Sequence, residues 1–325
     1  MNYISRISVF TLVASTFIGS ASCTNKVQSI EKFSSDSADV FASIIPQDPT
    51  ERPITYKGIP VVTLKDSIPT ENSEIYINLN FTILDQNLEI TDDLLNFGLY
   101  NLADTGFFYT PDSVCSEKYR FVFIGMSSQE AAERLANIAS KEFYEELPTI
   151  LTYECGFNID INVYPVFLNS EYVTYYKNAY CYTGGANGNS VLTLQTYNSN
   201  TGKALDIKDI IKPDKLIKLR ETVAAHMASS YPIYEGISTV QQYLDSLNQW
   251  RGATDLDRVP EHASSNNIEL ITLKNYPIGD LGITAEGLVF CYPKYFLTPG
   301  SDGCPVIVVK YDEIRDCLKS PFNCY

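Results

Sequence analysis

The sequence predicts an α+β fold, in which helices pack on a largely antiparallel sheet and two domains follow each other in 325 residues. Apolar and polar residues alternate over 75–83, 155–164 and 172–182, the period of half-buried strands. Helical spacing instead follows polar N-cap residues near 127 and 238. The chain also has 23 Tyr against 16 Phe and 1 Trp, and Tyr suits sheet faces that stay partly wet.

The N-terminus has the pattern of an exported protein. Arg6 precedes a short apolar run at 7–14, and the small residues 20–22 stand directly before Cys23. We expect residues 1–22 to be a secretory signal peptide, because the apolar run is too short to span a bilayer. The small residues before Cys23 resemble a bacterial lipobox, which implies lipidation of Cys23. Ser20 stands where such motifs usually have Leu, a departure that Bacteroidetes lipoproteins tolerate.

The next segment is predicted to be a tether. Residues 24–55 are rich in Ser, Asp, Lys, Thr and Pro and show little periodicity, which is typical of a flexible linker. With Cys23 as its anchor, residues 23–55 would hold the folded part away from a membrane. We expect an N-terminal α+β companion domain at 56–170 and a second α+β domain at 171–325.

Within 56–170, alternation begins at Ile59 and a helix is predicted near 128–146. Ser127 and Glu130 have the spacing of a capping box, in which each side chain satisfies a free backbone N–H of the other. An apolar stripe then follows at helical spacing: Ala131, Leu135, Ile138, Phe143 and Leu147.

The second domain is predicted to alternate strands and helices. The strand 191–197, the turn 198–202 and the short strand 203–206 form a hairpin pattern. Helices are expected to begin at Pro213 and after Ser238. The remaining predicted elements are strands at 268–273, 287–292 and 306–309, and a helical turn or two at 312–318.

The formal charge of −15 argues against nucleic acid as a partner, because phosphate binding needs a basic surface. Basic proteins, cationic peptides or divalent ions would be attracted instead, although solubility is the commoner reason for such acidity. With only 2 His and no Cys-x-x-Cys pair among 8 Cys, we expect no metal site and no cofactor. Cys115 and Cys155 are expected to be isolated thiols, and Cys317 with Cys324 would close a small loop.

No residue set predicts catalysis. His226 lies in a predicted helix, where packing is the expected role, and His262 lies in a polar loop. Among 39 acids, carboxylate pairs arise by chance, so we expect solvated surface rather than glycosidase chemistry. The acids considered were Asp206, Asp209, Asp280, Glu286 and Asp302. Asp255 and Asp257 have half the pattern of a calcium loop but lack its Gly and distal Glu.

A glycine-rich stretch, YTGGANGN at 182–189, joins two predicted strands. A phosphate-binding loop would carry a Lys and lead into a helix, and this stretch has neither. The sequence therefore predicts a sharp strand-to-strand connection, with a binding lip as its second use. The residues of this candidate loop are Tyr182, Gly184, Gly185, Asn187 and Gly188. For the Tyr-rich strand before it, a core position is slightly favoured over a binding platform.

Two blocks of sequence together resemble a known family. The first is 175–188 (YYKNAYCYTGGANG) with the hairpin 200–211, and the second is 283–295 with 306–314. Their order and spacing are similar to the extracytoplasmic domain of RsiV-type anti-sigma factors, which PdaC-type peptidoglycan deacetylases share. The resemblance covers 171–318 well and 57–170 more weakly. The family usually has His where this chain has Asn187, and an Ala-Pro-Tyr-like run where it has TPGSD.

RsiV-type domains bind lysozyme, a strongly basic enzyme, so the resemblance implies a binding role that the acidity independently suits. The sigma-binding segment of that family is not expected here, and in the deacetylases the chemistry belongs to a separate catalytic domain. We therefore expect a non-enzymatic lipoprotein, exported and lipid-anchored in the cell envelope, that binds a basic protein such as lysozyme or a cell-wall glycan. The alternatives are an enzyme that modifies envelope polysaccharide and a structural subunit of an envelope complex.

Overall fold

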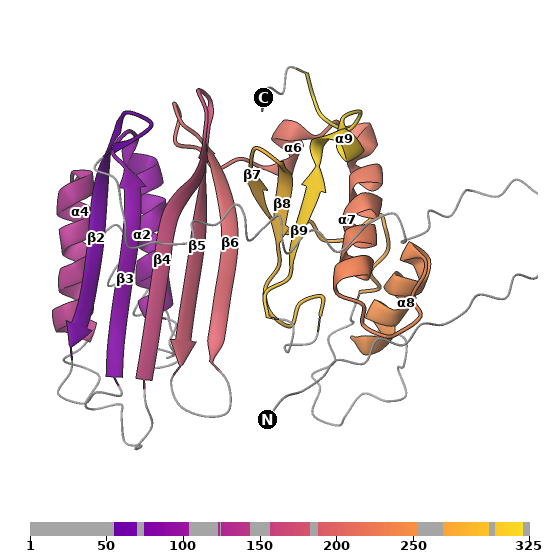
Figure 1. Ribbon diagram of the computed structural model, residues 1–325, viewed down its shortest axis with the longest axis horizontal. Helices are drawn as coiled ribbons and strands as arrows, with labels where there is room; N and C mark the ends of the chain where they lie inside the picture. Colours follow the sequence, from indigo (N-terminus) through magenta and orange to yellow (C-terminus); the bar gives the residue numbers. More distant parts are fainter. Residues whose placement is uncertain are drawn as a thin grey trace, which may run out of the picture.

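The computed structural model describes residues 55–69, 75–103, 123, 125–143, 157–182, 188–251, 269–298 and 303–320. These residues form one six-stranded sheet in the order β1-β2-β3-β4-β5-β6 and one three-stranded sheet in the order β7-β8-β9. Figure 1 shows helices α2 and α4 on one side of the large sheet, and α7 and α8 beyond the small sheet. The predicted α+β class is confirmed. No described helix is both long and apolar enough for a membrane span.

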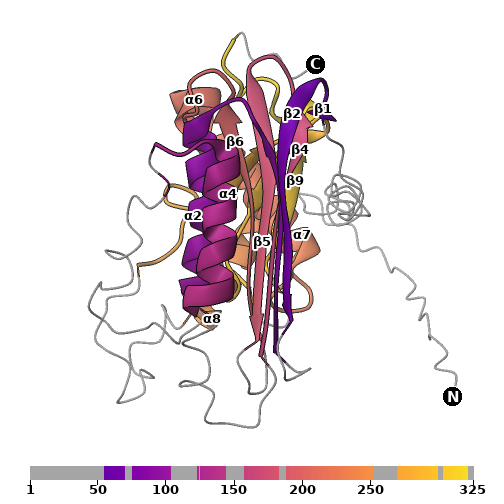
Figure 2. The same cartoon turned by 90° about the vertical axis from the view of Figure 1, so that its left-hand side faces the viewer.

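The large sheet is antiparallel except for one pair. Its strands are β1 (Thr55–Tyr56), β2 (Ile59–Pro69), β3 (Ile75–Leu84), β4 (Phe157–Leu168), β5 (Tyr172–Tyr182) and β6 (Asn189–Asn198). β3 and β4 run parallel, with Ile77 opposite Ile159. Parallel neighbours need a long crossover connection. The crossover between β3 and β4 contains α2 and α4, which form the helical layer beside the large sheet in Figure 2.

The two crossover helices differ in how well the sequence predicts them. α4 (Ser128–Asn137) begins with the predicted capping box at Ser127 and Glu130 and continues as a π-helical turn to Phe143, so this prediction is confirmed as far as the structure describes it. α2 (Leu88–Ala103) was not predicted. Its Gly98 weakens helical propensity, but a Cβ there would lie 2.6 Å from Phe81 Cζ. The close approach of α2 to the sheet therefore requires this glycine.

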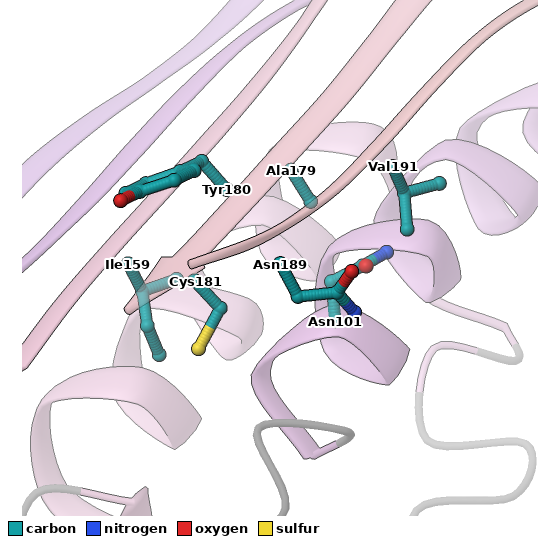
Figure 3. Close-up of a pocket in the computed structure, with 7 residues that line it drawn as sticks. All are labelled: Asn101, Ile159, Ala179, Tyr180, Cys181, Asn189 and Val191. Atoms are coloured by element: carbon teal, nitrogen blue, oxygen red, sulfur yellow. The ribbon is translucent and has the colours of Figure 1, made fainter. Parts of the chain in front are cut away.

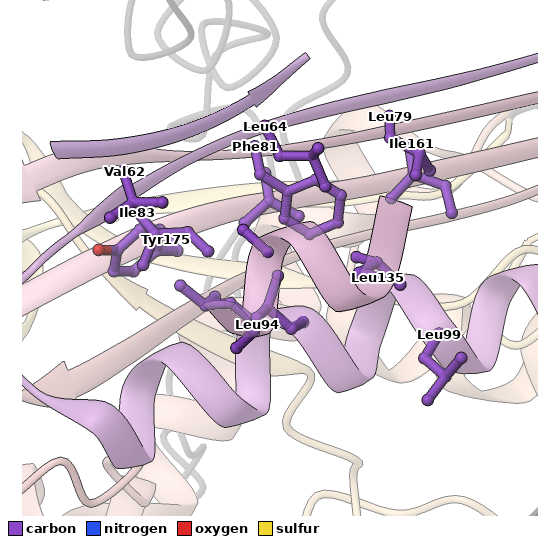
Figure 4. Packing of buried hydrophobic residues seen from close by; sticks show 14 of the residues in the cluster. Val62, Leu64, Leu79, Phe81, Ile83, Leu94, Leu99, Leu135, Ile161 and Tyr175 are labelled. Atoms are coloured by element: carbon purple, nitrogen blue, oxygen red, sulfur yellow. The ribbon is translucent and has the colours of Figure 1, made fainter. Parts of the chain in front are cut away.

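The first core lies between these helices and the large sheet. Every second residue of Ile77–Ile83 on β3 and of Ile159–Val163 on β4 points to the helices and is fully buried, and α2 and α4 contribute the facing side chains (Figure 4). The members labelled there are Val62, Leu64, Leu79, Phe81, Ile83, Leu94, Leu99, Leu135, Ile161 and Tyr175.

The second unit has its own core. β7 (Asp280–Ile283), β8 (Gly287–Cys291) and β9 (Val306–Lys310) form the small sheet. α7 (Leu216–Ser230) follows a 3-10 turn at Pro213–Lys215, and α8 (Val240–Trp250) starts from the N-cap Thr239. The short helices are α6 (Ile207–Ile210) and α9 (Tyr311–Ile314). Residues such as Leu219, Leu247 and Phe290 bury the helix-facing side of the small sheet.

The two sheets meet through a third, smaller cluster. Tyr164, Tyr176 and Leu194 of the large sheet pack against β8 and β9, and the two Tyr rings stack with centroids 4.8 Å apart. Buried hydrogen bonds join the units, because Thr174 Oγ1 donates to Ile283 O (2.6 Å) and Ile283 N donates to Thr196 Oγ1 (2.8 Å). The four layers are therefore helix, sheet, sheet and helix.

The boundary expected between residues 170 and 171 lies inside the β4–β5 hairpin of the large sheet. β5 and β6 bury one face in the first core, so the chain passes from the first core to the second in the connection after β6.

Two element predictions differ from the structure. The predicted strand 203–206 makes only one bridge, Tyr197 to Ala204.

The predicted strand 268–273 is wrong over its described part, 269–273. There the Asn248 side chain takes the place of a neighbouring strand. Its Nδ2 donates to Ile271 O (2.9 Å), and Ile271 N donates to its Oδ1 (2.8 Å). Ile271 is the one buried residue of this described part, and a side chain satisfies its backbone, so the run forms no strand pair.

Candidate functional site

The glycine-rich loop joins β5 to β6, and the structure describes both of its ends. Tyr182 ends β5, Gly188 precedes β6, and Cys181 pairs with Asn189 at the base of the loop. Gly184, Gly185 and Asn187 lie outside the described residues, as does the proposed lipidation site Cys23. The connection is strand to strand, and the use of the loop as a binding lip stays a prediction.

Gly188 is required by a close approach. A Cβ on this residue would lie 2.5 Å from the hydroxyl oxygen of Tyr180 and 2.6 Å from its ring. The Tyr180 ring therefore lies directly across the backbone of Gly188, where any larger residue would displace it.

A second segment, more than a hundred residues later, meets the loop at this point. Lys294 Nζ donates to Gly188 O (3.5 Å), and Cys304 Sγ donates to Ser190 O (3.3 Å). Lys294 and Cys304 lie near the two ends of the connection between β8 and β9, the strands that carry the second sequence block of the family resemblance. The fold thus brings the two blocks together where β5 ends and β6 begins.

Tyr295, in that second segment, has the strained backbone that functional loops often keep. Its φ is +66°, a left-handed conformation that costs a bulky residue free energy. Its side chain is nevertheless 59% exposed, and Phe296 beside it is 42% exposed. Lys294 Nζ lies 5.1 Å from the Tyr295 ring centroid. Two aromatic side chains and a cation are therefore presented together beside Gly188.

A shallow pocket opens on the other side of the same strand ends, against α2 (Figure 3). Its cavity volume is about 20 Å³, room for a single water molecule. Its polar groups are engaged locally, since Asn101 Nδ2 donates to Phe97 O (2.7 Å) and Asn189 Oδ1 accepts from Ser190 N (3.0 Å). The lining residues are Asn101, Ile159, Ala179, Tyr180, Cys181, Asn189 and Val191. In Figure 3 the Tyr180 side chain points away from the others, toward the opposite face of the sheet.

The face of the large sheet opposite the helices carries a set of polar and aromatic side chains, of which only Tyr182 was a predicted site residue. We call the set the amide face, and it is formed by alternate residues of β3, β4 and β5. Its members are Tyr76, Asn78, Asn80, Asn158, Asp160, Asn162, Asn178, Tyr180 and Tyr182. The signal was present in the alternation of Asn and Asp with buried aliphatics in INLN and NIDIN.

The histidine that the structure describes has a packing environment. His226 Nε2 lies 2.9 Å from Glu313 Oε1, and the imidazole is buried in α7. Burial tends to raise the pKa of Glu313, but the hydrogen bond and charge of His226, with a bond from the Lys310 amide, lower it overall. The pair ties α7 to α9. His262 lies outside the described residues.

The carboxylates considered for catalysis are dispersed. Asp206 and Asp209 form the capping box of α6, and the bond from the Lys208 amide lowers the pKa of Asp206. Asp280 and Glu286 are exposed at the start of β7 and in the turn before β8. Asp302, Asp255 and Asp257 lie outside the described residues. Within the described part of the chain, no three His, Cys, Asp or Glu side chains group so that they could hold a metal ion.

One buried cation lies on the helix side of the sheet. Lys177 Nζ is 3.5 Å from Asp93 Oδ2 and 3.4 Å from the Tyr197 hydroxyl, which itself donates to Asp93. Burial, reinforced by the Asp93 charge, raises the pKa of Tyr197. This cluster fastens α2 to β5 and β6, so we assign it to packing.

The family match falls in the second unit, whereas two solved structures align with most of the chain. Residues 208–312 match a family model described as a protein of unknown function, DUF3298, so the chain carries a DUF3298 domain there. Two DUF3298 family structures, one from Bacteroides fragilis and one from Pseudomonas aeruginosa, each show 15% identity, cover 81% of this chain and give a TM-score of 0.43. The alignments cover 93% and 95% of those chains. No curated protein gives a significant match.

Proposed function

We propose that this chain with a DUF3298 domain is a non-enzymatic binding protein of a bacterial cell envelope. A lipid on Cys23 would anchor it, and its RsiV-like region would capture a cell-wall glycan. The observation that carries the proposal is the meeting of the glycine-rich loop with the Lys294–Phe296 segment, where Lys294 Nζ reaches Gly188 O at 3.5 Å.

A glycan suits this meeting point for a chemical reason. Tyr295 and Phe296 expose flat aromatic surface, against which the apolar face of a sugar ring can stack, while the phenol hydroxyl and Lys294 offer hydrogen bonds. The left-handed backbone of Tyr295 supports a functional role, because a strained conformation persists only where the surrounding structure enforces it.

A basic protein, such as lysozyme, is the second candidate. The formal charge of −15 favours it, since long-range attraction speeds the encounter with a cationic partner. Such attraction weakens as salt rises, because the screening length falls to about 8 Å at physiological ionic strength. Salt dependence therefore separates the two candidates.

The proposal is tested on the purified full-length chain in detergent micelles. Calorimetry would measure its association with soluble peptidoglycan fragments and with lysozyme, at low and at physiological salt. We expect Tyr295→Ala to weaken glycan binding by about tenfold, as the loss of one stacking platform implies. The matched control is Tyr234→Ala, because Tyr234 is 46% exposed and lies between α7 and α8.

Absence of binding to either ligand at both salts would refute the proposal, and so would equal losses in the two Tyr variants. Release of new saccharide products during the incubation would instead support the alternative of an enzyme that acts on envelope polysaccharide.

A further inference from the structure

We infer that the amide face of the large sheet is a binding surface for an uncharged glycan chain. The inference rests on the proposed binding function and extends it, because it names the ligand class and places the ligand on β3, β4 and β5. It depends on contacts that are separate from the Tyr295 segment.

The register of the sheet arranges the amide face in rows across the strands. Asn80 lies opposite Asn162, and Asn162 lies opposite Asn178, so three carboxamides form one row. The adjoining row contains Asn78, Asp160 and Tyr180. With neighbouring strands about 4.8 Å apart, the three-Asn row extends over about 10 Å. The surface thus presents repeated donors and acceptors along a line.

The three-Asn row has no described protein partner for its side chains, unlike the other two rows of the amide face. Asn78 Nδ2 donates to Asp160 Oδ1 (2.9 Å), and Asn158 Nδ2 donates to the Tyr76 hydroxyl (2.7 Å). Among the described residues, the side chains of Asn80, Asn162 and Asn178 make no hydrogen bond, although all three are half-buried.

One atom in the row of Tyr76, Asn158 and Tyr182 also lacks a partner. Asn158 Oδ1 is buried and accepts no hydrogen bond within the described structure. An unsatisfied buried acceptor costs free energy. Because this oxygen is closed to solvent, a ligand would have to contact the other groups of the amide face.

Aromatic rings border the amide rows. Tyr76 is 40% exposed at one side of the face, and Tyr180 is half-buried at the other, where it crosses Gly188. Carboxamides that bond hydroxyls, together with rings that stack on the apolar faces of sugars, are the two kinds of contact that an extended saccharide needs.

The charge of the face indicates an uncharged ligand. The whole chain carries −15, yet Asp160 is the one ionisable acid or base among the named members of the amide face, and Asn78 already donates to it. Over the described side chains of β3–β5 this surface has no other charged group. The register places one base, Lys65 of β2, opposite Asn80 at the end of the three-Asn row, so one acid and one base leave the face without an excess of either charge. A neutral polyhydroxyl chain is matched by neutral donors and acceptors.

A solvated sheet face is the simplest alternative, and its composition counts against it. Asn and Asp are depleted in strands because their side chains compete for backbone hydrogen bonds, whereas Thr is a polar residue that strands favour. Here Asn or Asp occupies the β3 and β4 positions of two adjacent rows, Asn78 with Asp160 and Asn80 with Asn162. Both strands are interior strands of the sheet. Such residues weaken the strands they occupy, and ligand recognition explains their use.

The test uses the full-length chain in detergent and four probes. Chitotetraose and cellotetraose are uncharged, tetragalacturonate is their anionic counterpart, and lysozyme is the basic protein. The variants are the double substitution Asn162→Ala with Asn178→Ala, and the matched control Asn137→Ala. Asn137 is an exposed residue of α4 on the far side of the sheet.

We expect at least one uncharged tetramer to bind and tetragalacturonate not to bind. The double variant should bind about tenfold more weakly, because two hydrogen bonds are lost, while its urea midpoint and the affinity of Asn137→Ala stay unchanged. Failure of both uncharged tetramers to bind the intact chain would overturn the inference, as would an unchanged affinity in the double variant. If lysozyme alone binds, the inference fails and the broader binding function stands.

Discussion

The two faces of the large sheet are built by the same strands and differ in every respect that matters for function. On β3, Leu79 and Phe81 point to the helices and are fully buried, whereas Asn78 and Asn80 point the other way and are half-buried. The backbone pairing that supports one face supports the other. One face therefore stabilises the fold, and the other can vary in composition without loss of the core.

The second face is itself divided. Around Thr174, Tyr176 and Thr196 of β5 and β6 it is covered by the small sheet, and these residues are buried. Over β3, β4 and the C-terminal half of β5 it carries the amide rows. This face contributes to stability where the small sheet packs on it. The polar residues of the amide rows gain no such packing partner, so their presence requires another explanation.

The largest effect expected from this comparison is on the helix-facing side. Phe81→Ala should lower the free energy of unfolding by about 3–5 kcal/mol, because the ring is fully buried and the cavity beside Gly98 cannot close completely. Asn80 precedes Phe81 on β3 and points to the other face, and Asn80→Ala should change the free energy of unfolding by no more than about 0.5 kcal/mol. Urea unfolding followed by circular dichroism measures both, and similar losses in the two variants would break the distinction between the faces.

At the seam between the sheets we expect an intermediate effect. Thr196→Val removes the acceptor of the Ile283 amide and leaves that buried group unpaired, which should cost about 1–3 kcal/mol. Thr193 lies on the opposite face of the same strand, and its buried hydroxyl has no partner among the described residues. Thr193→Val should therefore be neutral or stabilising. The reverse order in a thermal-unfolding measurement would show that these hydrogen bonds do not join the sheets.

A smaller effect of opposite sign is expected at Tyr295. Tyr295→Gly relieves the left-handed backbone and should stabilise the chain by about 1 kcal/mol, while glycan affinity falls with the lost ring. Tyr295→Phe keeps both ring and strain, so it should leave stability nearly unchanged. A Gly variant that is less stable than the parent would show that the ring packs for stability and that its exposure has no functional meaning.

The smallest effect concerns acid stability far from both faces. The folded-state pKa of Glu313 lies below its ordinary value, so its contribution is present above the unfolded-state pKa and is lost as pH falls through the folded-state pKa. We expect Glu313→Gln to reduce the loss of thermal stability between neutral pH and about pH 3. Its affinity for glycan should not change at neutral pH. A variant with the same pH dependence as the parent would exclude this role for the His226–Glu313 pair.

Much of the fold was predictable because short-range patterns determine it. Strict alternation predicted β3, β4 and β5, and Ser127 with Glu130 predicted the start of α4. The strand 269–273 was wrong because Asn248 satisfies Ile271 from a distant helix, which periodicity cannot reveal.

The parallel pairing of β3 with β4 and the long helix α2 were also missed. Pairing partners are set by tertiary contacts, and Gly98 hides a helix whose glycine is required by the Phe81 ring.

The candidate site was predictable only in part. The glycine-rich loop was recognised, and Gly188 proves necessary for the position of Tyr180. The proximity of Lys294 to that loop depends on how the two sheets stack, so no local pattern contains it. The amide face could have been found, because Asn and Asp alternate with aliphatics on two strands. Only the register shows that Asn80, Asn162 and Asn178 form one row.

The separation of the two faces is tested most directly by one calorimetric titration of Asn80→Ala with chitotetraose, compared with the unaltered chain after both have shown the same urea midpoint. We predict a several-fold loss of affinity in a variant of unchanged stability, since one carboxamide of the three-Asn row is removed. Equal affinity in the two proteins would contradict it and would return this face of the sheet to an ordinary solvated surface.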